Sequence, residues 1–99
     1  GVARERIVTD PGIGFGKTVE HNLILLRNLS LFHALGCPIL LGVSRKGFIG
    51  KLGGEPQAGR RAPGSIAVGL AGLGQGVQIL RVHDVAETMQ ALRLWQAVR

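Results

Sequence analysis

Cysteine, acidic residues, aromatic residues and long apolar runs are all scarce in this chain of 99 residues. Cys37 is the single cysteine, which excludes an internal disulfide framework and fits a reducing compartment, so a cytoplasmic location is expected. No run of about 18 consecutive apolar residues occurs, which excludes a membrane-spanning helix. We find no basic-then-apolar signal segment before the first predicted strand. No membrane partner is therefore expected.

Basic residues outnumber acidic ones, with twelve Lys and Arg against six Asp and Glu and a formal charge of +6. Such an excess suits anionic ligands, namely phosphates, nucleic acid or a membrane surface. The basic residues are dispersed along the chain, and they are not interleaved with its three Phe and one Trp. A basic module that binds nucleic acid is thus an alternative interpretation, but no nucleic-acid partner is the prediction.

Three short apolar runs, at residues 7–9, 38–44 and 77–83, are each followed by a loop and then by a helical pattern. Their spacing fits a strand with a returning helix, and a βαβαβα order predicts a parallel sheet covered by helices. Residues 1–99 are then one compact α/β unit at most. Right-handed crossovers would place the carboxyl ends of all three strands at one rim, where α/β proteins carry their chemistry.

The predicted helices have recognisable ends. A helix over residues 19–35 is capped by Thr18 and stopped by Gly36. Ser65 is expected to cap a second helix that runs to the Gly-rich break at residues 74–76. Asp84 and Glu87 form a D-x-x-E arrangement that predicts a capping box for the last helix. Between these elements, residues 51–63 read "KLGGEPQAGRRAP" and predict a mobile loop.

The last helix carries apolar residues at helical spacing. They are Val85, Met89, Leu92 and Trp95, and they are expected to form one core or interface face.

Unusual polar residues follow all three strands. Alternation along the third strand puts Arg81 and His83 on one face, where both can donate to one anion. Alternatively, Arg81 pairs with Asp84 or Asp10, and His83 caps the following turn. The second strand ends in Ser44, which is followed by the basic residues Arg45 and Lys46.

The first strand leads into the stretch "TDPGIGFGKT" at residues 9–18. It misses both common phosphate-loop patterns, because Pro11 and Lys17 stand where glycines are needed. Its Asp10 offers a carboxylate for paired N–H donors, unless it serves only the turn, and Phe15 suits packing on a flat ring.

The motifs "DPGIGFGK", "GVSRKGFIG" and "RVHDV", in this order, resemble the C-terminal part of the dihydropteroate synthase family. The resemblance covers essentially the whole chain. It implies three β/α units of a (β/α)₈ TIM barrel, with the helices outside. It also implies an enzyme of folate synthesis, the sulfonamide target, which joins a dihydropterin-methyl diphosphate to 4-aminobenzoate and releases diphosphate. Another pterin-binding barrel, such as a methyltetrahydrofolate methyltransferase domain, is the alternative.

The resemblance assigns roles by motif. Asp10 and Lys46 would bind the pterin, Arg81 would contact both the pterin and the diphosphate, and His83 would bind the diphosphate.

Phe15, Ser44 and Lys46 would form the aminobenzoate site, and no residue of this chain is expected to bind metal. Mg²⁺ is the implied cofactor, with its ligand in the missing N-terminal part. A partial barrel is expected to be inactive alone and to associate as a homodimer or a swapped oligomer.

Overall fold

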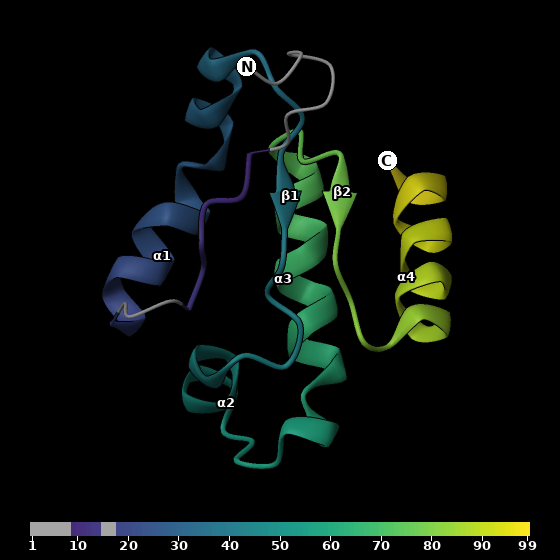
Figure 1. Cartoon of the computed structure of the whole chain (residues 1–99). Coiled ribbons are helices and arrows are strands. Elements are labelled where there is room, and N and C mark those ends of the chain that lie inside the picture. Colours follow the sequence, from purple (N-terminus) through teal and green to yellow (C-terminus); the bar gives the residue numbers. More distant parts are fainter. Residues whose placement is uncertain (1–8, 15–17) are drawn as a thin grey trace.

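The computed structural model describes residues 9–14 and 18–99. Helices and two short strands alternate along the chain, and Figure 1 shows the helices arranged around the strands. The elements are α1 (Val19–Arg27), η2 (Leu29–Leu35), β1 (Leu40–Leu41), α2 (Gly47–Gly53), η3 (Ala58–Arg60), α3 (Ala62–Gly74), β2 (Ile79–Leu80) and α4 (Val85–Val98).

The strands are parallel, as predicted. β1 pairs with β2 in the register Leu40 to Ile79, and an isolated parallel bridge joins Thr9 to Ile39 on the other side of β1. The Thr9 segment, β1 and β2 therefore lie side by side, and the two arrows in Figure 1 point toward the end where α2 lies. The strands are shorter than the apolar runs, and residues 7 and 8 of the first run lie outside the described residues.

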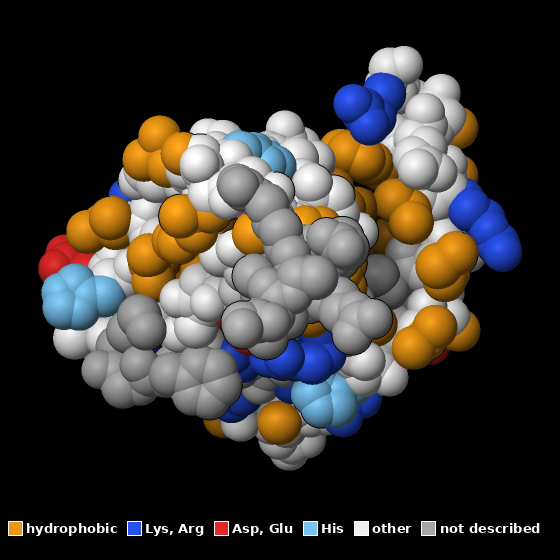
Figure 2. Space-filling model, turned by 45° about the horizontal axis from the view of Figure 1, so that its top comes forward, with side chains coloured by type: hydrophobic (Ala, Val, Ile, Leu, Met, Phe, Trp, Pro, Cys, Tyr) orange, Lys and Arg blue, Asp and Glu red, His pale blue; other side chains and the backbone are white. Residues whose placement is uncertain are grey.

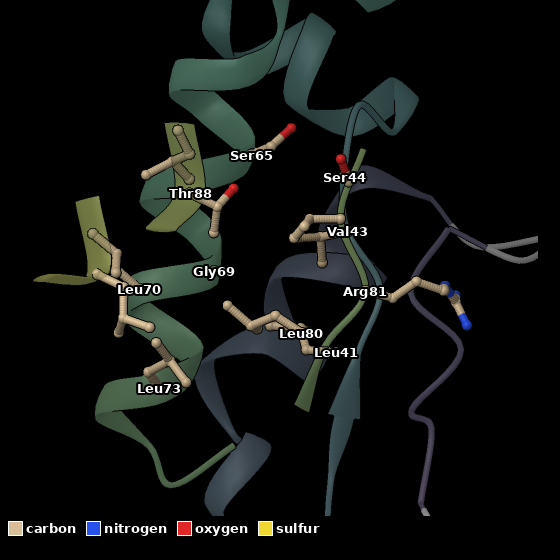
Figure 3. A pocket seen from close by; sticks show the side chains of 13 residues that line it. Leu41, Val43, Ser44, Ser65, Gly69, Leu70, Leu73, Leu80, Arg81 and Thr88 are labelled. Carbon is tan, nitrogen blue, oxygen red and sulfur yellow. The ribbon is translucent and has the colours of Figure 1, made fainter. Parts of the chain in front are cut away.

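Helix α3 packs against one face of the sheet. Figure 3 shows the side chains of Leu41, Val43 and Leu80 pointing toward it. Leu41 is 1% exposed, and a Cβ added at Gly72 would lie 2.5 Å from a Leu41 methyl carbon. The absence of a side chain at Gly72 therefore sets how closely the helix approaches the strand. The buried apolar core consists of Ile13, Leu29, Ile39, Leu41, Val43, Phe48, Ile49 and Val77.

The predicted helix over residues 19–35 is interrupted at Asn28. The predicted ends are confirmed, because the Thr18 hydroxyl accepts from the His21 N–H at 3.1 Å and Gly36 adopts a left-handed φ of 72°. At Asn28 the side-chain amide donates to the Ile24 carbonyl at 2.8 Å. An Asn side chain that competes for backbone groups favours a helix end, and the chain continues as the 3-10 helix η2.

Two capping predictions are wrong. Helix α3 begins at Ala62 with Pro63 in its first turn, so Ser65 lies inside the helix. Asp84 does occupy the N-cap position of α4, but its side chain makes no capping bond. Both side chains instead bind a residue outside their own helices, Arg45.

Residues 51–63 are not one irregular loop, because they include the end of α2, all of η3 and the start of α3. The Arg61 guanidinium ties the segment together by donating to the carbonyls of Glu55, Pro56 and Arg45, at 3.0, 2.7 and 2.9 Å. One fixed guanidinium therefore orders a stretch whose composition favours a loop.

Hydrophobic side chains are exposed on both flanks of the molecule (Figure 2). Leu31 of η2 is 70% exposed and Leu94 of α4 is 62% exposed. All of α4 is at least partly exposed, so the predicted face of Val85, Met89, Leu92 and Trp95 does not belong to the core. Within residues 9–14 and 18–99, the helices are too short or too polar to cross a membrane.

Candidate active site

Polar side chains from three segments meet at the carboxyl end of the strands. A hollow of about 150 Å³ lies there, bordered by the residues that follow β1 and β2. Its lining consists of Gly42, Ser44, Lys46, Arg81, Val82 and His83. Asp10, at the end of the Thr9 segment, reaches the same place through Arg81. The structure thus brings together five of the six predicted site residues, and the sixth, Phe15, lies outside the described residues.

Arg81 leaves the sheet on the side opposite to Leu80, as strand alternation predicts (Figure 3). Its guanidinium lies over Gly42, where an added Cβ would be 2.2 Å from Nη2. One Nη1 to Oδ2 distance of 3.6 Å pairs it with Asp10, and the two side chains are 55% and 38% exposed. The pairing that the sequence left as an alternative therefore exists, and both partners still face solvent.

His83 is held by the hydroxyl of Ser44. The Ser44 oxygen accepts from the His83 backbone N–H at 3.1 Å and lies 2.9 Å from Nδ1 of the same residue. Ser44 is 8% exposed, so only a small part of its side chain faces solvent beside this contact. The imidazole is thereby fixed at Nδ1, and Nε2 is the ring nitrogen with which it can meet a ligand.

Lys46 reaches across the sheet to the loop after Thr9. Its side chain passes over Gly14, whose φ is 88°, and its ammonium donates to the Ile13 carbonyl. The Gly14 N–H donates in turn to the amide oxygen of Asn22 at 2.8 Å, and Asn22 is 3% exposed. Asp10 also accepts from the Gly12 N–H at 2.9 Å, so it serves the turn as well as Arg81.

Sequence reasoning gave no role to an ion pair between Arg45 and Asp84. Nε and Nη2 of Arg45 donate to the two carboxylate oxygens at 3.1 and 2.6 Å. The hydrogen bond from Arg45 lowers the pKa of Asp84. Arg45 directly follows Ser44 in the motif "SRK", and Asp84 directly follows His83 in the motif "VHD". A contact between Ser44 and His83 would have suggested a second contact between the residues that follow them.

Comparison with known proteins identifies the family. The model of the pterin binding enzyme family matches residues 1–83. The chain is 50% identical to the dihydropteroate synthase of Neisseria meningitidis serogroup C over 99 residues, which cover 99% of this chain and 35% of that protein. It is 44% identical to the Escherichia coli K12 enzyme, covering 98% of this chain and 34% of the relative. The chain thus spans about a third of the relatives' length.

Solved structures agree. The dihydropteroate synthase of Thermus thermophilus in complex with 4-aminobenzoate superposes with a TM-score of 0.90 at 50% identity, over 93% of this chain and 36% of that one. The Xanthomonas albilineans enzyme in complex with 7,8-dihydropteroate gives 0.95 at 46% identity, over 99% and 37%. The resemblance predicted from the three motifs is therefore confirmed, and this chain belongs to the family of pterin binding enzymes.

Proposed function

We propose that this chain is the C-terminal part of a dihydropteroate synthase. The whole protein would condense 7,8-dihydropterin-6-ylmethyl diphosphate with 4-aminobenzoate and release dihydropteroate and diphosphate. One observation carries the proposal: Asp10, Lys46, Arg81 and His83 meet at the carboxyl end of parallel strands, where barrel enzymes keep their active sites. Related enzymes with 42–50% identity bear this name.

The residues divide between the two ends of the pterin substrate. Arg81 and His83 suit the diphosphate, because a guanidinium fork and an imidazole N–H both donate to phosphate oxygens. We infer that the Ser44 hydroxyl donates to Nδ1 of His83, which puts the ring proton on Nε2 and makes that nitrogen a donor. Both groups would then stabilise the charge that develops on the diphosphate as its bond to the methylene carbon breaks.

At the other end, Asp10 would accept from the 2-amino group and a ring N–H of the pterin. Lys46 would donate to the pterin carbonyl and ring-nitrogen edge and lie beside the aminobenzoate. Phe15 and Ser44 would complete the aminobenzoate site. The amine of 4-aminobenzoate would attack the methylene carbon and give up a proton, and no side chain of this chain acts as a nucleophile.

Mg²⁺ is the cofactor that we propose for the whole protein, with its ligand outside this chain. The described part of the chain brings no three His, Cys, Asp or Glu side chains together around a possible cation. A bound Mg²⁺ would supply further charge neutralisation at the diphosphate. The contribution of the present residues to that anion is then limited to Arg81 and His83.

For the assembly, we propose that residues 1–99 form three β/α units of a (β/α)₈ barrel, act in the cytoplasm and are inactive alone. The exposed apolar flanks on α1, η2 and α4 favour association as a homodimer or a swapped oligomer. Light scattering tests this inference, and a monodisperse monomer would contradict it.

Calorimetric titration with the dihydropterin diphosphate and Mg²⁺ tests the binding function. We expect saturable binding, and Lys46→Ala and Arg81→Ala should each weaken it by about tenfold or more, since each removes a charged hydrogen bond worth about 1.5–3 kcal/mol. Arg60→Ala is the matched control, because Arg60 is 71% exposed and pairs only loosely with Glu55, at 3.8 Å. A folded chain that gives no binding heat would refute the proposal for this chain.

A further inference from the structure

Two parallel connections join the loop after β1 to the loop after β2. The first is the contact between Ser44 and His83, and the second is the ion pair between Arg45 and Asp84. Each loop contributes two consecutive residues, in the same order. A single hydrogen bond lets two loops rotate about it, whereas two adjacent connections, one of them bidentate, fix both spacing and orientation.

Arg45 is fixed through its backbone N–H, its backbone carbonyl and its guanidinium. Its N–H donates to the Ser65 hydroxyl at 2.8 Å, its carbonyl accepts from Arg61 at 2.9 Å, and its guanidinium binds Asp84. Among the residues that the structure describes, Arg45 alone combines a side chain with a positive φ, 59°. Such a backbone is unfavourable for an ordinary side chain and persists where its surroundings hold it, often at functional sites.

The left-handed backbone at Arg45 has a geometric result. It turns the chain sharply between Ser44, which faces His83, and Lys46, which crosses to the Ile13 carbonyl. The side chains of Ser44 and Lys46, on either side of Arg45, therefore point to different parts of one site. Partly exposed ion pairs contribute little to folding stability, and these side chains are 32% and 16% exposed. Stability alone is thus a poor reason for so many contacts around Arg45.

We propose that Arg45 and Asp84 are positioning residues for the proposed diphosphate and pterin site, whose function this inference assumes. Their ion pair would hold the His83 imidazole at the orientation that binds the anion, and the turn at Arg45 would place Lys46. Neither Arg45 nor Asp84 touches the substrate in this arrangement. Each acts through its sequence neighbour.

Two substitutions of Arg45 separate its roles. Arg45→Gly removes the guanidinium and suits a positive φ, so the fold should survive with a melting temperature close to that of the wild type. Arg45→Lys keeps the charge but cannot form the fork. Arg60→Gly removes the same charge from an exposed, loosely paired arginine and serves as the control. All are compared in the 99-residue chain.

The first measurement is the ¹⁵N–¹H spectrum of the His83 imidazole, assigned by its loss in His83→Gln. We expect the His83 signals to move toward those of a solvated histidine in both Arg45 variants and to stay unchanged in Arg60→Gly. The second is titration with inorganic pyrophosphate, whose affinity should fall about tenfold or more in both variants, as displacement of a binding group predicts. The charge-swapped double variant Arg45→Asp with Asp84→Arg should restore the signals in part.

The outcomes distinguish this inference from the proposed function. Unchanged His83 signals in Arg45→Gly and Arg45→Lys overturn the positioning role, whether or not pyrophosphate binds. Wild-type affinity in Arg45→Lys also overturns it, because the charge alone would then explain any loss in Arg45→Gly. Displaced His83 signals in a chain that never binds pyrophosphate support the positioning role of Arg45 and Asp84 and count against the proposed function.

Discussion

Gly42→Ala is a substitution that should impair binding with little effect on the fold. The added methyl carbon would lie 2.2 Å from Nη2 of Arg81 and 2.7 Å from its Cζ. Carbon atoms do not approach so closely, so the guanidinium has to leave its place over residue 42. Because the Arg81 side chain is 55% exposed, it can swing into solvent and lose its contact with Asp10.

The effect on stability should be small. Replacing Gly by Ala at a backbone that alanine can adopt stabilises a protein by about 0.4–1 kcal/mol through the unfolded state. An exposed ion pair such as Arg81 with Asp10 is worth about 0–1 kcal/mol. The two terms offset, and the free energy of unfolding should change by less than about 1 kcal/mol. Binding differs, because losing a hydrogen bond to a charged group costs about 1.5–3 kcal/mol, a roughly ten- to hundredfold loss of affinity.

Thermal denaturation and calorimetric titration with the dihydropterin diphosphate measure the two effects separately. Gly74→Ala is the control, since an added Cβ there meets nothing within 4 Å. In an Arg81→Ala background, Gly42→Ala should have no further effect on affinity, because the group that it displaces is already gone. The reasoning is refuted if Gly42→Ala binds like the wild type, or if it lowers affinity equally with and without Arg81.

Three further predictions concern the surroundings of the site. Leu41→Ala should lower the free energy of unfolding by about 2–5 kcal/mol in urea denaturation, because Leu41 is 1% exposed; a loss well under 1 kcal/mol would contradict its place in the core. Asn22→Ala leaves the Gly14 N–H without its buried acceptor, which should cost about 1–3 kcal/mol and speed hydrogen exchange at that amide; unaltered exchange would count against the contact. The Arg45 hydrogen bond lowers the pKa of Asp84 in the folded protein below its ordinary value of 3.8. The stability that this ion pair contributes is therefore fully present above pH 3.8 and is lost as the pH falls through the lower pKa of the folded state. Melting temperatures measured down this pH range should fall less steeply for Asp84→Asn, and parallel curves would disprove the linkage.

Periodicity and spacing predicted the parts of this protein that depend on the backbone. Three apolar runs with intervening helical patterns were enough for a parallel sheet, and alternation along the third run was enough to put Arg81 on the face opposite to Leu80. The end signals at Thr18 and Gly36 also held, because an N-cap hydroxyl and a left-handed glycine act within a few residues of themselves.

The two failed capping predictions involve side chains that found partners far away in the sequence. Ser and Asp are common at helix N-caps, but the side chains of Ser65 and Asp84 bind Arg45. Asn28 ended a helix that its apolar neighbours would have continued. The pairing of Asp10 with Arg81 was an open alternative because two carboxylates compete for one guanidinium, and only the three-dimensional arrangement decides between them.

Helix α3 contacts the core near one end and the surroundings of the candidate site near the other. Gly72 and Ser65 are both buried on this helix and lie about two turns apart, roughly 10 Å along its axis. At one end, the missing side chain of Gly72 lets Leu41 approach; at the other, Ser65 holds the amide of Arg45. We therefore expect that a bulkier residue at position 72 pushes α3 away from β1 and weakens the contact between Ser65 and Arg45. Loss of substrate recognition should thus arise from substitutions all along the buried side of α3, including positions that no ligand can reach.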